Sequence, residues 1–158
     1  MAIVGLDELR RRMKPRDRLL GLDLGEKTIG LALSDTLLTV ATPFKTLKRG
    51  KFTADAKALQ ALIAEHGVGG LIVGLPLNMD GSEGPAAQSA RAFGRNFGQV
   101  SDCPVAFSDE RLSTAAVTRT LLAADASRNK RKEVVDKMAA AYILQGALDK
   151  LRHLPPPA

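Results

Sequence analysis

The chain has very little sulfur, imidazole or aromatic surface. Cys103 is its one cysteine, and the 158 residues include two histidines. A single cysteine excludes an internal disulfide and a cysteine zinc site, and two isolated histidines are too few for a His-based metal site. Tryptophan is absent and aromatic residues make up 4%. The core must therefore be aliphatic, and the chain lacks the aromatic platform of RNA modules that stack splayed bases.

Long apolar runs are also missing. No stretch approaches the roughly 20 apolar residues of a membrane helix, and the amino terminus has no apolar run suited to a secretory signal. We therefore expect a cytoplasmic protein that has no contact with a membrane. The apolar fraction of 45% and the length are sufficient for one globular domain with a real core.

Positive charge exceeds negative charge, with a formal net charge of +6. Such an excess favours polyanions, because binding releases their counterions. The basic residues gather in three clusters, within 10–18, 45–51 and 128–132. Each cluster lies at an expected element boundary, where its side chains could reach a common ligand. Any one of them can also be an ordinary solvated loop.

The apolar pattern predicts a β-meander followed by β-α units. Residues 18–24, 28–34 and 40–47 alternate as strands with short connections, and Pro43 favours an edge position for the third. Further strands are expected at 70–75 and 105–108. Helices are expected at about 52–66, 86–98, 113–124 and 133–151, with a basic linker before the last.

This order predicts an α/β fold, a five-stranded mixed sheet flanked by helices. We expect the first strand to be central and the third to lie at one edge. The first, fourth and fifth strands should be parallel and central. Their carboxyl ends would then share the edge at which open α/β sheets bind ligands.

An aspartate interrupts the first apolar run. Leu20, Leu22 and Leu24 alternate with Gly21, Asp23 and Gly25, so Asp23 faces away from the leucines. Burying an unpaired carboxylate costs several kcal/mol, roughly, unless a cation or hydrogen bonds compensate. The flanking glycines let a metal, a phosphate or another backbone approach closely. A turn-capping role is the alternative.

Further acidic residues, from the end of the fifth strand and from the last helix, are expected at the same edge of the sheet. Asp109 and Glu110 end the fifth strand, and Asp136 lies near the start of the last helix, before the small residues Ala139 to Ala141. Strand alternation puts Asp109 and Glu110 on opposite faces, and spacing alone does not choose between them. Carboxylates from separate elements, without His or Cys, suit Mg²⁺ or Mn²⁺ in phosphodiester hydrolysis.

Four motifs in this order resemble the YqgF family. They are the segments 21–35, 73–85 and 109–114, and Asp136 together with the residues that follow it in the last helix. The resemblance covers roughly residues 18–151 and implies a ribonuclease-H-like fold. It also implies a nuclease, either a processor of the 5′ end of pre-16S rRNA or a Holliday-junction resolvase.

The resemblance implies roles for individual residues. Asp23, Glu110 and Asp136 would form the catalytic carboxylate triad and hold Mg²⁺ or Mn²⁺, so Glu110 is preferred to Asp109. Nucleic acid, either RNA or branched DNA, is the expected partner. Substrate contacts are expected from Lys27, Asn78, Ser82, Arg111, Arg128, Lys130 and Arg131.

The division of the chain and its assembly are further expectations. We expect a basic arm over 1–17, a nuclease domain over 18–151 and a disordered proline-rich tail over 152–158. A homodimer would suit symmetric cutting of a four-way junction. Two other functions remain open: an ATP-binding protein, since Asp23-Leu24-Gly25 with Gly30 resembles a phosphate motif, and a non-catalytic nucleic-acid-binding module.

Overall fold

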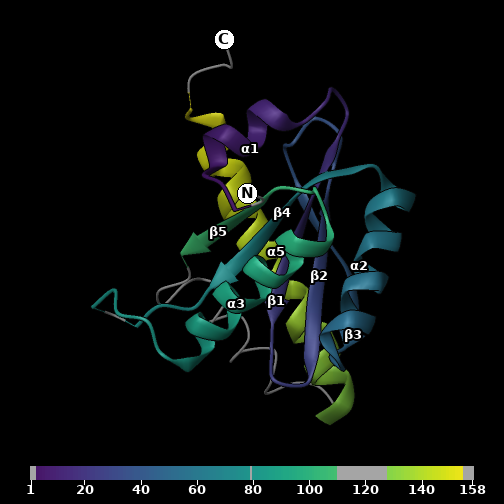
Figure 1. Cartoon of the computed structure of the whole chain (residues 1–158), viewed down its shortest axis with the longest axis vertical. Helices are drawn as coiled ribbons and strands as arrows, with labels where there is room; N and C mark the ends of the chain where they lie inside the picture. Colours follow the sequence, from purple (N-terminus) through teal and green to yellow (C-terminus); the bar gives the residue numbers. More distant parts are fainter. Residues whose placement is uncertain (1–2, 79, 110–127, 155–158) are drawn as a thin grey trace.

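A five-stranded sheet with helices on both faces forms the body of the molecule (Figure 1). The computed structural model describes residues 3–78, 80–109 and 128–154, with the backbone alone for 128–135. The elements within these ranges are α1 Leu6–Arg12, β1 Arg18–Leu24, β2 Thr28–Ser34, β3 Ala41–Lys48, α2 Phe52–His66, β4 Val68–Leu75, α3 Pro85–Val100, β5 Val105–Asp109 and α5 Arg128–Arg152.

The strand order is β3-β2-β1-β4-β5. β1 pairs with β2 and β2 with β3 in antiparallel fashion, whereas β4 runs parallel to both β1 and β5. The predictions of a mixed sheet, a central first strand and an edge third strand are confirmed. β5 is parallel to β1 as expected but forms the other edge, so the expectation that it is central was wrong. Its edge is extended by Ile3, which bridges to Val105.

Two apolar clusters lie on opposite faces of the sheet. One joins the leucines at alternate positions of β1 and β2 to α2 and α3, including Leu20, Leu22 and Phe97. The other joins the opposite face to α1 and α5, including Leu19 and Leu144. Each strand thus sends alternate side chains to different layers. A strand residue therefore points to the face of the sheet opposite the apolar cluster that its immediate neighbours in the strand join.

α5 packs unusually close to the sheet because glycines face it. A Cβ on Gly21 would lie 2.8 Å from the Cβ of Leu144 and 3.0 Å from the carbonyl oxygen of Ala140. A Cβ on Gly30 would collide with the main-chain carbonyl of Asp136. The helix itself has small residues in this region, namely Ala139, Ala140 and Ala141, which are all buried. Small residues on both the sheet and the helix thus allow α5 to approach closely.

α2 ends as the sequence predicts, with Gly67 at φ 65° in the left-handed region. The start of the last helix differs from the prediction. α5 begins at Arg128, so the basic segment 128–132 belongs to the helix and is not a linker. Nothing in its residue types stops a helix, since lysine, arginine and glutamate are good helix formers. The expected helix at 113–124 lies outside the described residues.

Among the residues described, no helix combines the length and the apolar character needed to cross a membrane.

Candidate active site at the carboxyl end of the central strand

Asp23 lies near the carboxyl end of β1 and is 8% exposed. Its register partner on β2 is Gly30. Leu22 and Leu24 pack with the α2 and α3 layer, so the alternation places Asp23 on the face that α5 covers. The carboxylate of Asp23 is therefore largely removed from water. It lies on the face of β1 that α5 covers, and α5 packs directly on the neighbouring strand β2.

Asp136 comes to the same place from α5 and is also buried, at 9% exposure. The close approach of its main chain to Gly30 sets it beside the register partner of Asp23. The hydroxyl of Thr28 donates a hydrogen bond to Oδ2 of Asp136. On β2, the side chain of Thr28 thus orients the Asp136 carboxylate, and Gly30 provides the space that the main chain of Asp136 needs.

The β1–β2 turn is held in place by Arg49, which follows β3. Its Nη1 donates to the carbonyl oxygen of Gly25 at 2.7 Å, and its main-chain N–H donates to the carbonyl of Lys27 at 2.8 Å. Nη2 lies 3.4 Å from the hydroxyl of Ser89 on α3. Within the turn, the Gly25 N–H donates to the Thr28 carbonyl at 2.8 Å. Arg49 therefore connects the turn that follows Asp23 to a helix of the opposite layer.

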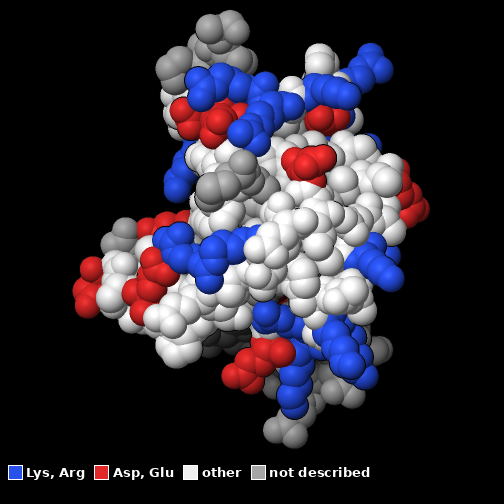
Figure 2. Space-filling model, in the orientation of Figure 1, with Lys and Arg blue, Asp and Glu red and all other residues white. Residues whose placement is uncertain are grey.

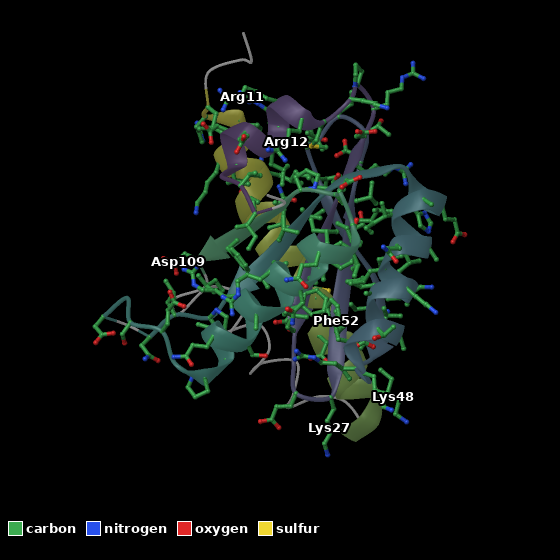
Figure 3. All side chains as sticks on the ribbon, viewed as in Figure 1. Arg11, Arg12, Lys27, Lys48, Phe52 and Asp109 are labelled. Atoms are coloured by element: carbon green, nitrogen blue, oxygen red, sulfur yellow. The ribbon has the colours of Figure 1, made fainter. Side chains whose placement is uncertain are left out.

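Exposed cations surround this turn. Figure 2 shows blue side chains at the lower end of the molecule, and Figure 3 places Lys27 and Lys48 there. Together with Lys51 they are exposed, and no carboxylate of a described residue makes an ion pair with them. This end of the sheet combines buried acids with accessible positive charge, as a site for a phosphate backbone requires.

The loop after β4 contains the predicted contacts Asn78 and Ser82. In this structure they bond to each other, with Asn78 Nδ2 donating to Ser82 Oγ at 2.9 Å. Ser82 also donates through its hydroxyl and main-chain N–H to Asp80 Oδ1, at 2.6 and 2.9 Å. The hydroxyl and N–H of Ser82 lower the pKa of the Asp80 carboxyl. The loop thus carries a negative charge directly beside the two predicted contacts.

Of the other predicted site residues, the structure describes some completely, some by their backbone alone and some not at all. Lys27 is an exposed turn residue at the candidate site. Glu110 and Arg111 lie outside the described residues. Arg128, Lys130 and Arg131 lie in the backbone of the first turns of α5, and their side chains are outside the description.

The end of β5 bears on the choice between Asp109 and Glu110. Val105 and Phe107 pack with the α2 and α3 layer, whereas Ala106 packs with the α5 layer. Asp109 has the parity of Val105 and Phe107 and is exposed. It therefore does not share the face on which Asp23 lies.

The donor set brought together here suits a hard cation. Mg²⁺ and Mn²⁺ favour oxygen ligands, and carboxylates from two elements leave room for waters and substrate oxygens. Asp23 and Asp136 supply such oxygens from a buried position. Within the described ranges no group of three His, Cys, Asp or Glu side chains is gathered. Glu110, which the family resemblance implies as the third carboxylate, lies outside those ranges.

Sequence reasoning did not single out Thr28 and Arg49. Thr28 lies five residues after Asp23 at the start of the returning strand, so it must lie near the same edge. Arg49 was one of several cations in the 45–51 cluster. The topology could have selected it, because an antiparallel third strand returns its end to the edge where the first strand ends. The hydrogen bonds from Thr28 to Asp136 and from Arg49 to Gly25 depend on side-chain geometry, which the sequence pattern does not give.

A family model described as RuvX, Holliday junction resolvase, matches residues 17–150. Similar sequences include a protein of Paramagnetospirillum magneticum, 61% identical over 94% of this chain and 96% of its own length, and one of Jannaschia sp. strain CCS1, 59% identical over 94% and 95%. Both are named "Putative pre-16S rRNA nuclease".

The fold is similar to that of a solved structure entitled "T. thermophilus RuvC in complex with Holliday junction substrate". It has a TM-score of 0.52 and 10% identity, and the match covers 89% of this chain and 99% of that one. This likeness confirms the ribonuclease-H-like fold that the motifs predicted. With a family model matched over most of its length and relatives that share more than half of their residues with it, the chain belongs to the RuvX family, which is the YqgF family its motifs resemble.

Proposed function

We propose that the chain is a Mg²⁺- or Mn²⁺-dependent endonuclease that hydrolyses phosphodiester bonds at the 5′ end of pre-16S rRNA, during ribosome biogenesis in the cytoplasm. The observation that carries the proposal is the burial of two acids, Asp23 and Asp136, on either side of Gly30, which pairs with Asp23 and closely approaches the main chain of Asp136. The names of the relatives support the rRNA substrate.

The chemistry follows from the residues at this edge. Hydrolysis of a phosphodiester develops negative charge on both the attacking and the leaving oxygen. A divalent cation supplies compensating charge and lowers the pKa of a bound water. Asp23 and Asp136 would hold it through oxygens, with Asp136 kept in position by Thr28. Burial strengthens these charge interactions, since water is largely excluded from the two acids.

Glu110 is proposed as the third carboxylate. Regular alternation along β5 favours it over Asp109, because Asp109 has the parity of the α2 and α3 face. In the sequence it directly follows Asp109, the last residue of β5, and β5 pairs in parallel with β4, which pairs in parallel with β1; this supports the proposal.

Substrate binding is proposed to depend on the cations around the site. Lys27 is exposed on the turn after Asp23, with Lys48 and Lys51 nearby. The basic residues of the first turns of α5, namely Arg128, Lys130 and Arg131, and Arg111 after β5 would extend this surface. Asn78 and Ser82 would contact substrate only after exchanging their present bonds with each other and with Asp80.

Resolution of Holliday junctions is the second candidate. It is favoured by the description of the matched family model, and the chain has the same fold as a solved RuvC. Paired cuts in a four-way junction require two active sites, so this function would need a homodimer. Trimming of an rRNA end needs one site and no dimer.

A direct comparison of substrates tests the proposal. The purified chain is incubated with a labelled RNA spanning the 5′ end of pre-16S rRNA, or with a labelled DNA four-way junction, in Mg²⁺, Mn²⁺ or EDTA. We expect cleavage of the RNA with either metal and none with EDTA. Preferred, paired cleavage of the junction would instead support the resolvase.

The same assay also distinguishes the two functions that do not involve cleavage. Binding of both nucleic acids without any cleavage would support a binding module. ATP binding without cleavage would support the ATP-binding alternative. Either result would contradict the proposed function.

A further inference from the structure

A hollow lies at the end of β1 opposite to the end that carries Asp23. It has a volume of about 390 Å³ and is walled by the connection between α1 and β1 and by the loop after β2. β1 has seven residues, and a strand rises about 3.3 Å per residue, so roughly 15–20 Å separate the hollow from the candidate active site. Its lining includes Met13, Lys14, Arg16, Asp17, Leu37 and Leu38.

The charge of this hollow is positive and accessible. Arg11 and Arg12 on the neighbouring α1 are paired with acids of the same helix, at 3.8 and 3.3 Å. Lys14 and Arg16 are exposed, and no carboxylate of a described residue forms an ion pair with either side chain. Figure 2 shows blue side chains at this upper end of the molecule.

The other charged groups of the hollow are engaged with main-chain atoms. Arg10 Nη1 donates to the carbonyl of Leu151 at 2.9 Å, which ties α1 to the end of α5. Asp17 is the one acid in the lining, and its Oδ2 accepts the main-chain N–H of Lys14 at 2.8 Å. The cations that remain accessible to a ligand are Lys14 and Arg16.

The backbone of the hollow is held in an uncommon shape. Arg16 has φ 71° and Leu38 has φ 58°. They are the non-glycine residues with positive φ in the described part of the chain, and both line this hollow. Such conformations cost about 1–3 kcal/mol each and concentrate where a ligand is clamped. The two walls of the hollow thus each contain one strained residue.

The rim of the hollow is apolar. Leu37 is 80% exposed, and Val40 farther along the same loop is 51% exposed. Leu37 is the most exposed of the large apolar side chains that the structure describes. Met13 and Leu38, which are half-buried, continue this aliphatic surface into the hollow. An aliphatic rim beside unpaired cations favours a ligand that is both acidic and apolar.

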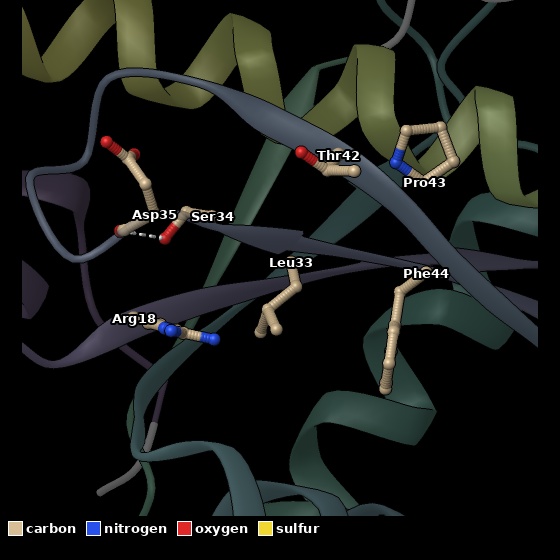
Figure 4. A pocket seen from close by; sticks show the side chains of 7 residues that line it. All are labelled: Arg18, Leu33, Ser34, Asp35, Thr42, Pro43 and Phe44. Carbon is tan, nitrogen blue, oxygen red and sulfur yellow. Dashed lines mark hydrogen bonds between the residues drawn. The ribbon is translucent and has the colours of Figure 1, made fainter.

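A separate pocket is lined in part by Arg18 and Asp35, which adjoin the lining residues Asp17 and Thr36 in the sequence. It measures about 280 Å³ and contains Arg18 and Phe44 (Figure 4). Asp35 points away from Arg18 in Figure 4, and its carboxylate accepts the main-chain N–H groups of Thr39 and Val40 at 2.7 and 3.0 Å. It therefore leaves the charge of Arg18 available.

We propose that this end of the molecule docks an acidic segment of a partner protein, with Lys14 and Arg16 binding its carboxylates and Leu37 and Met13 packing against its aliphatic side chains. The hollow is far enough from the active site for both to be occupied at once. Of its nine lining residues, five precede residue 17, at which the segment matched by the family model begins.

A peptide fits the lining better than a nucleic acid does. Single-stranded nucleic acids bind proteins by stacking bases on aromatic rings. The hollow has no aromatic residue among its described lining, and its apolar part is made of leucine, methionine and proline. Carboxylates spaced by leucines match such a surface in both charge and apolar character.

The test uses a fluorescein-labelled peptide of alternating glutamate and leucine and measures its binding to the whole chain by fluorescence anisotropy. We expect saturable binding that weakens at least about tenfold in the variant Lys14→Gln, Arg16→Asn, since asparagine tolerates positive φ. Leu37→Ser should weaken it several-fold. Arg11→Gln, Arg12→Gln removes the same charge from paired positions and should change it less than about twofold. Nuclease rates should be unchanged in all three.

Two controls decide the chemistry. A glutamate–serine peptide should bind more weakly than the glutamate–leucine peptide, and an oligouridylate of equal length should compete poorly. The proposal is overturned if the glutamate–leucine peptide shows no saturable binding up to roughly 1 mM, or if the Arg11 and Arg12 variant loses as much as the Lys14 and Arg16 variant. Tighter binding of oligouridylate that depends on Lys14 and Arg16 would make the hollow a substrate contact and overturn it as well.

Discussion

Thr28 shows how one hydroxyl group supports the proposed chemistry. It donates to the carboxylate of Asp136 from the first residue of β2. A hydrogen bond to a charged group contributes about 1.5–3 kcal/mol, and it also restricts the direction in which the carboxylate points. Thr28 is therefore a positioning residue for Asp136.

Replacing Thr28 separates positioning from folding. Thr28→Val keeps the shape of the side chain but removes the donor, so the cleavage rate should fall about tenfold to a hundredfold. Thr28→Ser should retain most of the activity, because it keeps the hydroxyl. Single-turnover rates and melting temperatures of the two variants give the comparison. Equal rates for the valine and serine variants would show that the bond to Asp136 has no role in catalysis.

Gly30 and Gly146 form a matched pair for testing the close approach of α5. A Cβ on Gly30 would collide with the main-chain carbonyl of Asp136, whereas a Cβ on Gly146 meets nothing within 4 Å. Gly30→Ala should destabilise the fold by about 1–3 kcal/mol and move Asp136, with loss of activity. Gly146→Ala lies inside α5 and should stabilise it by about 0.5–1 kcal/mol.

Urea unfolding and cleavage rates check both glycine variants. If Gly30→Ala keeps wild-type stability and activity, α5 does not depend on glycine at that position. If Gly146→Ala destabilises, the helix interior near residue 146 is more crowded than the structure indicates.

At the scale of elements, the loop between β2 and β3 is tied together by Asp35. Partial burial acts to raise the pKa of its carboxyl, but hydrogen bonds from the hydroxyl of Thr39 and from the main chain of Val40 and Thr39 outweigh it and lower the pKa to about 2. The same loop carries Leu37 and Leu38, which line the proposed docking hollow. Its shape should therefore depend on the charge of Asp35.

This lowered pKa gives a pH dependence with a definite sign. The group binds protons more weakly in the folded state than in the unfolded state, where the pKa is 3.8. Its contribution is complete above pH 4 and is lost as the pH falls toward 2. Wild type should lose stability more steeply between pH 4 and 2 than Asp35→Asn, measured as the urea midpoint. Parallel curves for the two proteins would contradict this assignment.

Elements also show what the sequence could and could not predict. The strand at 18–24 and the meander followed from alternating leucines and short turns, and Gly67 ended α2 as expected. The start of α5 did not follow, since a run of lysine and arginine is typical of both a solvated linker and a helix. The central position of β1 followed from the connections, whereas the edge position of β5 needed strand pairing.

At the scale of the whole molecule, topology explains why distant residues form one site. Asp23 could be predicted because a carboxylate inside an apolar strand is costly without compensation. That Asp136 meets it depends on Gly30, whose missing side chain lets α5 descend onto β2. The Thr28 bond, the Arg49 clamp and the internal bonds of Asn78 and Ser82 depend on side-chain geometry, which spacing does not give.

The two ends of β1 are proposed to bind different partners. The carboxyl end of β1 carries the buried acids and the exposed Lys27, Lys48 and Lys51. The other end carries the hollow with Lys14 and Arg16. Exposed positive charge is thus present at both ends of β1.

The most direct test of the central claim is the single-turnover cleavage rate of Asp23→Asn and Asp136→Asn, with Asp109→Asn as the control, on the substrate that wild type cleaves best in Mg²⁺. The account predicts a loss of at least about 100-fold for each of the first two, with wild-type melting temperatures or higher. Asp109→Asn should stay within a few-fold of wild type, because Asp109 is exposed and has the parity of the opposite face. Wild-type rates in Asp23→Asn or Asp136→Asn would contradict the claim that these two buried carboxylates form the catalytic centre.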